Sequence, residues 1–399
     1  MALISIESPA RRPAPQGWAP FALGFRPFFL AAGLYAVVMM GLWLGVLKGV
    51  IRIGGLAPVL WHAHEMIFGF AVAVIAGFLL TAARNWTGLA TPSGRALAAL
   101  FLLWLAGRVS FFVPGLSPGS IALIDLLFLP VLAVVLARPI LKAHQFHNFP
   151  FPLMLLVLTA ANALVHAEAL GRSDARAGTG LYLAVYVIVT MITVMGGRVI
   201  PSFTDNKLGS RARRWKTLEI LVPVTTLAAL LAVLIVPRSP LTALLAAAAA
   251  SAHGIRLAGW YTSKLWSVPL LWVLHLGYAW IPAGFVLLAV SAAGLNPMAT
   301  GSALHAFTAG AIGVLTLGMM ARVSLGHTGR MLEPARLMTL AFAALNLAAL
   351  IRVGVPLFAP GAYATTLLLA GLLWMTGFGL FVAIYAPILL RPRVDGKPG

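Results

Sequence analysis

Residues able to bind a metal or carry a proton open one of the most apolar stretches of the chain. His62, His64 and Glu65 fall within four residues, directly after Trp61, in a run that continues to residue 88 with the length and apolarity of a membrane-spanning helix. Ionisable groups in such a helix are costly, so they usually face a bundle interior, pair with one another or bind something. These residues alone leave three interpretations open: metal or haem ligands, a proton-conducting site, or polar groups that hydrogen-bond between helices.

The composition is that of an integral membrane protein. Of the 399 residues, 61% are hydrophobic and 9% are charged, and the mean hydropathy is +0.97. Soluble domains carry about 25% charged residues. The chain contains no cysteine, which excludes disulfides, thiolate ligands and iron–sulfur clusters. Any bound metal must therefore use histidine, carboxylate, methionine or backbone oxygen.

Twelve apolar runs are long enough to cross a bilayer, and they predict an all-α, polytopic helix bundle. If the N-terminus is cytoplasmic, 21 of the 28 Lys and Arg residues fall in inner segments and six in outer loops, while Arg108 lies inside the third run. This asymmetry fits the positive-inside rule and places both termini in the cytoplasm. The net charge of +19 then orients the protein and contacts anionic lipid, and a nucleic-acid partner is not expected. The runs lie near residues 27–47, 60–83, 96–113, 119–138, 150–170, 179–199, 217–236, 240–259, 268–290, 301–323, 335–355 and 363–390.

The linkers between these runs are too short to form a soluble domain. We expect a cytoplasmic tail over residues 1–24, a single transmembrane bundle over residues 25–390 and a second cytoplasmic tail over residues 391–399. Two of the runs are weakly similar to each other. The second begins with Trp61-His62-Ala63 and ends in Thr-Gly at residues 87–88, and the tenth has Leu304-His305-Ala306 near its start and ends in Thr-Gly at residues 328–329. The match is too short to establish a duplication.

Four histidines converge at one depth under this topology. His62 and His64 lie near the outer end of the second run, His166 lies one turn from the outer end of the fifth, and His305 lies near the outer start of the tenth. Imidazole is a ligand for copper, iron and zinc. We therefore predict a metal site made of His62, His64, His166 and His305 in the outer half of the membrane, with their nitrogens in one pocket.

The spacing of the first two histidines limits how they can act. Side chains at positions i and i+2 of a regular helix point about 200° apart, so His62 and His64 are expected to serve different partners. Three carboxylates lie in the same outer half: Glu65, Asp125 and Glu168. They are candidates for proton carriers in catalysis or for groups that orient the imidazoles, and simple pairing is the structural alternative for Glu168 near its helix end.

A second set of candidates lies toward the inner half. His275, with His253 or His327, could supply haem ligands, because four outer histidines cannot comfortably serve both a low-spin haem and a copper centre. Arginines near the inner ends of the helices could hold haem propionates by charge-assisted hydrogen bonds, with lipid phosphate as the plainer alternative. These cofactor-binding candidates are His275, His253, His327, Arg198, Arg322 and Arg330.

Several motifs resemble the NnrS family, and together they span nearly the whole chain. The most specific is WHAHEM at residues 61–66, followed by NWTG at residues 85–88. The others are FRPFF, GFLLTAARNWTG, the pair of Asn162 and His166, GGRVIPSFT and LHAFTAGAIGVLTLGMMARVSLGHTGR. The resemblance implies a bacterial inner-membrane protein that contains haem and copper and is linked to nitric oxide metabolism and nitrosative stress. Phe307 stands where a second histidine would have made the tenth run a chelator.

We therefore expect a multi-pass protein of the bacterial cytoplasmic membrane with haem, b-type, and copper as cofactors. It would bind or convert nitric oxide, or a nitrosylated iron complex, in the outer half of the bundle. The sequence does not identify its electron donor or establish whether it turns over a substrate. The alternatives are a proton-coupled transporter, with histidines and carboxylates as the relay, and a haem-binding sensor or accessory protein. A Soret band in the purified protein would exclude the transporter.

Overall fold

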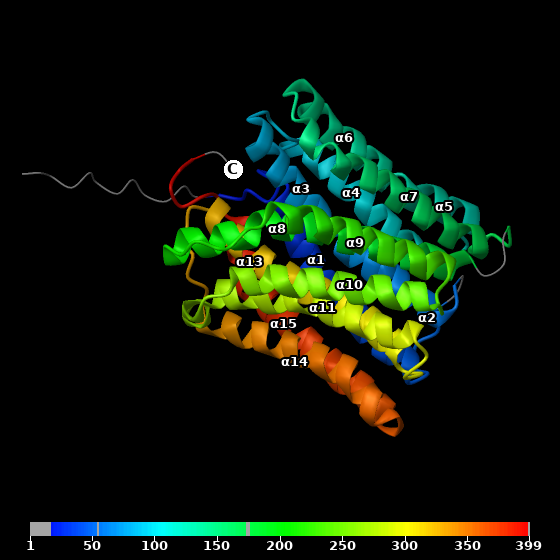
Figure 1. The fold of residues 1–399 in the computed structure, drawn as a ribbon. Coiled ribbons are helices and arrows are strands. Elements are labelled where there is room, and N and C mark those ends of the chain that lie inside the picture. Colours follow the sequence, from blue (N-terminus) through cyan, green and yellow to red (C-terminus); the bar gives the residue numbers. More distant parts are fainter. Residues whose placement is uncertain (1–16, 54–55, 173–175, 398–399) are drawn as a thin grey trace, which may run out of the picture.

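A computed structural model shows the chain as a bundle of α-helices that run roughly side by side (Figure 1). The structure describes residues 17–53, 56–172 and 176–397, and within these ranges it contains no β-strand. The α-helices are α1 (Phe25–Leu47), α2 (Pro58–His64), α3 (Val72–Thr87), α4 (Gly94–Ser110), α5 (Pro118–Leu126), α6 (Phe128–Lys142), α7 (Pro150–Ala169), α8 (Arg176–Leu208), α9 (Lys216–Ile235), α10 (Pro240–Trp260), α11 (Pro269–Ala292), α12 (Ala299–His305), α13 (Val314–His327), α14 (Arg336–Phe358) and α15 (Tyr363–Leu390). The π-helical segments are η1 (Glu65–Ala71) and η4 (Ala306–Gly313), and the 3₁₀ turns are η2 (Phe146–Asn148), η3 (Ser263–Ser267) and η5 (Pro360–Ala362).

The membrane bundle predicted from the sequence is confirmed, with eleven or twelve spans. Eleven helical segments of the described residues are long and apolar enough to cross a bilayer. The remaining predicted run is α4, whose 17 residues extend about 26 Å, slightly less than the ~30 Å hydrocarbon core. The run predicted over residues 119–138 is continuous in direction but is divided into α5 and α6 at Leu127.

The two ends of the described chain meet at one end of the bundle. The Ala19 amide donates to the Leu390 carbonyl at 2.8 Å, and the Arg26 guanidinium donates to the Leu389 carbonyl at 3.0 Å. The two ends of a chain lie on the same side of a membrane only if the chain crosses it an even number of times. Eleven spans without α4 would place them on opposite sides, so α4 crosses as well. The assignment of this end to the cytoplasm stays a prediction; below, "inner" denotes the end where the two chain ends meet and "outer" the opposite end. Most of the expected tail over residues 1–24 lies outside the described residues.

The two most buried spans share an unusual construction. The span Pro58–Thr87 consists of α2, η1 and α3, and the span Ala299–His327 consists of α12, η4 and α13. Each has a π-helical segment near its outer end, a feature that often marks a functional site. His64 immediately precedes one π segment and His305 the other. His64 and His305 are therefore structurally equivalent. The sequence comparison had aligned His62 with His305, which is wrong by two residues.

Glycines at matching positions let both spans approach their neighbours closely. A Cβ atom at Gly69 would lie 2.3 Å from the Tyr35 ring, and one at Gly310 would lie 2.5 Å from the Trp280 ring. A glycine with positive φ follows each helix, Gly88 (67°) directly after α3 and Gly329 (74°) two residues after the end of α13. A constant separation of 241 residues relates His64, Gly69, Gly77 and Gly88 to His305, Gly310, Gly318 and Gly329.

Candidate metal and proton site

A cluster of polar side chains lies inside the bundle near the outer end of α2. Its residues come from four separate parts of the chain, and each residue is at most 4% exposed. His64 ends α2 and Glu65 begins η1, while the others come from neighbouring helices. The members are His64, Glu65, Arg108 of α4, Asp125 of α5, and Asn162 and His166 of α7. We call these six residues the buried polar cluster.

Arg108 is the central cation of the buried polar cluster. Its Nη1 donates to both oxygens of Glu65, at 3.0 and 3.1 Å, and its Nη2 forms an ion pair with Asp125. Gly107 makes room for this pair, because a Cβ atom there would lie 2.9 Å from Asp125 Oδ1. The Tyr35 hydroxyl also donates to Glu65. One arginine therefore joins α4 to η1 and to α5 inside the bundle.

His64 occupies a position that requires a further cation. Its Nδ1 lies 2.7 Å from Glu65 Oε1 and must donate, because a carboxylate only accepts. Its Nε2 then faces two acceptor oxygens, Asn162 Oδ1 at 2.9 Å and Asp125 Oδ2 at 3.2 Å. The amide of Asn162 is oriented by Asp125, to which its nitrogen donates at 2.8 Å. A proton or a metal ion on Nε2 of His64 would satisfy these oxygens.

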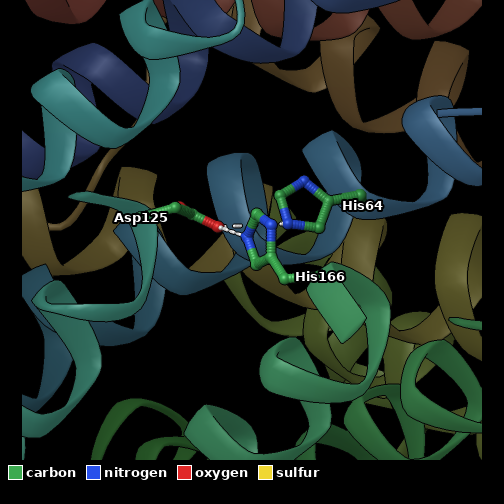
Figure 2. Close-up of side chains that lie close together, drawn as sticks. All are labelled: His64, Asp125 and His166. Atoms are coloured by element: carbon green, nitrogen blue, oxygen red, sulfur yellow. Dashed lines mark hydrogen bonds and ion pairs between the residues drawn. The ribbon is translucent and has the colours of Figure 1, made fainter. Parts of the chain in front are cut away.

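Charge counting leads to the same conclusion. Glu65 and Asp125 supply two negative charges, and Arg108 supplies one positive charge. Buried charges are stable only when they are paired. The missing positive charge falls where His64, Asp125 and His166 converge (Figure 2), with His166 Nε2 only 2.8 Å from Asp125 Oδ2.

These three side chains have the geometry of a small metal site. One ligand atom from each of His64, Asp125 and His166 lies within 4.8 Å of the other two. Two imidazoles and a carboxylate suit copper, iron or zinc. Glu65 and Asn162 would then orient the ligands, as the outer hydrogen-bond partners of metal sites do. Phe111 covers the two imidazoles, with ring centroids 5.2 Å from His64 and 6.1 Å from His166.

The other two predicted outer ligands lie in a separate group. The His62 ring stacks on Trp43 with centroids 4.5 Å apart, and its Nδ1 is buried without a hydrogen-bond partner among the described residues. His305 donates from Nδ1 to the Gly301 carbonyl at 2.7 Å. His305 and Arg352 are close enough to His62 to act on it electrostatically. The structure therefore does not bring all four histidines to one point, since His62 and His64 point to different partners as their spacing predicts.

The inner histidines differ in their capacity to bind a cofactor. His275 donates from Nδ1 to the Leu271 carbonyl at 3.0 Å, and its buried Nε2 has no hydrogen-bond partner within the described part of the chain. The backbone of Trp260 also lies near this ring, and Nε2 is the nitrogen of His275 that would be available to a metal. Both nitrogens of His253 are engaged, with Tyr278 and Thr226, each at 2.8 Å.

His253 belongs instead to a hydrogen-bonded chain through the inner half of the bundle. The Tyr278 hydroxyl accepts from Arg256 at 3.2 Å, and Arg256 also forms an ion pair with Glu219. Arg256 approaches so closely that a Cβ atom at Gly197 would lie 1.7 Å from its Nη2. This chain ties α9, α10 and α11 together, so His253 as placed fits a structural role better than ligation.

The remaining candidates lie near helix ends. Glu168 accepts from the Ala177 amide at 2.7 Å and caps the start of α8, and it contacts no member of the buried polar cluster in the described structure. His327 packs against Phe25, with ring centroids 5.8 Å apart. These two residues therefore lie apart from the buried polar cluster, and His327 lies at the inner end of α13.

The predicted arginines form part of a basic inner rim. Arg198 donates to Asn148 at 2.8 Å, and Arg322 lies 3.9 Å above the Phe203 ring. Arg330 has a buried Nη1 without a partner among the described residues, and burial and the charge of Arg391 lower its pKa. At the same rim, a hydrogen bond from Arg393 holds the pKa of Asp395 well below its usual range.

Sequence reasoning missed the roles of Arg108 and Tyr35. An arginine inside an apolar run is itself a signal that a buried carboxylate is near, whereas the charge pattern treats Arg108 only as an exception. Tyr35 carries no such signal. Its hydroxyl reaches Glu65 because α1 packs against η1 at Gly69.

The fold and this cluster together define a class: a polytopic helical membrane protein with a buried histidine–carboxylate centre able to hold a cation. Comparison with protein families then identifies the chain more closely. It belongs to the NnrS family, because the family model described as NnrS protein matches residues 19–393. No curated protein matched the chain.

Proposed function

We propose that this chain is a haem–copper protein of the bacterial cytoplasmic membrane that binds or converts nitric oxide, or a nitrosylated iron complex, in the outer half of its bundle. Membership of the NnrS family supports a role in the response to nitric oxide. The observation that carries the proposal is the buried convergence of His64, Asp125 and His166.

The donor set fits copper. Two imidazoles and one carboxylate meet at a place that lacks one positive charge, and Phe111 shields them from water. Arg108, Glu65 and Asn162 would fix the positions of the ligands without binding the metal themselves. Bound copper would supply a centre that coordinates the gas and exchanges one electron. The protein's own part is to orient the imidazoles and to keep the site dry.

Among the inner histidines, His275 is the best candidate for a haem ligand. His275 offers a buried Nε2 that makes no hydrogen bond within the described residues, and the Leu271 carbonyl orients its ring. His253 fits less well, because Thr226 and Tyr278 engage both of its nitrogens. In this proposal His275 is the haem ligand contributed by α11.

A proton-coupled transporter is the second candidate, and one observation favours it. A proton on His64 Nε2 would satisfy the two facing oxygens as well as a metal ion would. In that case the buried polar cluster would hold one exchangeable proton between Glu65 and Asp125. A transporter of this kind needs no redox centre.

Metal analysis separates the two candidates. The purified protein should contain about one copper per chain. Asp125→Asn and His166→Ala should each lower copper affinity by tenfold or more, because even outer hydrogen-bond partners of metals contribute about 10–100-fold. His147→Ala is the matched control. His147 is exposed, and its contact with Arg198 is made by the backbone carbonyl, which the substitution keeps. Copper content equal to wild type in both site variants would refute the copper site.

A further inference from the structure

An apolar cavity of about 110 Å³ lies in the inner half of the bundle, away from the buried polar cluster. It lies between α1, α3, α7, α8 and α13, and its walls include Phe78, Phe151, Met195 and Met319. Val199 and Met319 line it while remaining partly exposed, so the cavity opens toward the surface.

The walls can hold only an apolar group. Thr316 is the polar side chain among them, and its hydroxyl already donates to the Gly313 carbonyl at 2.9 Å. A water molecule needs two to four polar partners, so an apolar cavity of this size does not hold ordered water. The walls include no imidazole, and no iron–histidine bond could hold a ligand there.

Two cations follow closely on residues that line the cavity, Arg198 beside Val199 on α8 and Arg322 beyond Met319 on α13. Arg198 lies over the ring of Phe151 at 5.8 Å, and Phe151 itself forms part of the wall. Arg322 follows Met319 by three residues, which is nearly one turn of α13, and is only 7% exposed. Neither arginine forms an ion pair with a carboxylate anywhere in the described ranges. Arg322 packs on the Phe203 ring, but a ring carries no net charge, and a nearly buried guanidinium without an anion is unfavourable.

We propose that this cavity binds an amphipathic anion, with a segment of its acyl chain in the apolar cavity, the rest of the chain leaving through the opening, and an acidic head group beside Arg198 and Arg322. A cavity of about 150 Å³ holds one benzene-sized molecule, so this one accepts a slim hydrocarbon segment and not a porphyrin. Guanidinium groups bind carboxylate and phosphate alike. The head group is therefore that of a fatty acid or of a phospholipid. This inference does not depend on the copper or haem sites.

Native mass spectrometry of the purified protein tests the proposal with two probes, palmitate and dipalmitoyl phosphatidylglycerol. Wild type should retain about one equivalent of one probe. Arg322→Gln should weaken that binding about tenfold or more, as loss of a charge-assisted hydrogen bond implies. Thr316→Phe should abolish it by filling the cavity. Arg336→Gln is the matched control, because Arg336 is an exposed arginine at the same end of the bundle.

The identity of the retained probe distinguishes the fatty acid from the phospholipid. Trp fluorescence melting shows which variants are folded, and Arg322→Lys, which keeps the charge, should restore most of the binding. Equal retention of both probes by all variants would overturn the proposal. The proposal would also be overturned if Arg322→Gln lost haem absorbance but bound lipid as wild type does.

Discussion

Arg108 offers the sharpest test of how the buried polar cluster is held together. Arg108→Gln removes the arginine that contacts both Glu65 and Asp125, whose side chains are 1% and 3% exposed. Removing one partner of a buried ion pair typically costs about 3–5 kcal/mol, because the remaining charge is left buried and unpaired. We expect a decrease of that size in the free energy of unfolding.

Neutralising one carboxylate should recover part of this loss. In the double variant with Glu65→Gln, one charge of each sign has been removed, and Asp125 remains opposite His64. We expect the double variant to be more stable than the sum of the two single changes by about 1–3 kcal/mol, as is usual for residues in one network.

Unfolding in SDS followed by tryptophan fluorescence measures these differences, and the 11 tryptophans provide the signal. Arg95→Gln is the matched control, since Arg95 is an exposed arginine on the same helix, α4. Its stability should stay within about 0.5 kcal/mol of wild type. The reasoning fails if Arg108→Gln resembles Arg95→Gln, or if the effects in the double variant simply add.

Three further predictions concern packing, topology and haem. Gly69→Ala should cost about 1–3 kcal/mol, because the new Cβ would lie 2.3 Å from the Tyr35 ring, whereas Gly254→Ala meets nothing within 4 Å and should gain up to about 1 kcal/mol in the same unfolding assay. A reporter fused after Gly399 should be active only in its cytoplasmic version, and a periplasmic signal would contradict the assigned depth of every site. His275→Ala should change the haem absorption spectrum while leaving membrane insertion intact, and an unchanged spectrum would remove His275 as a ligand.

The sequence was sufficient for the features that depend on local composition. Apolar runs of the right length predicted the spans, and the distribution of Lys and Arg predicted the orientation that the reporter fusion will test. The run beginning at Trp61 identified His64 and Glu65 as chemically significant, because an ionisable residue in lipid needs a partner wherever its helix lies. The motifs in the same run led to the family, which the match over residues 19–393 confirms.

Only the tertiary structure decided which of these residues meet. His64 joins His166 and Asp125, while His62 stacks on Trp43, and His253 is engaged by Thr226 and Tyr278. Such pairings depend on how each helix is rotated about its axis and on how closely its neighbours approach. The π segment after His64 and the glycines at the helix contacts set both quantities. Hydropathy reports depth along a helix but not the direction in which a side chain points, so the partners of each histidine could not be read from the chain alone.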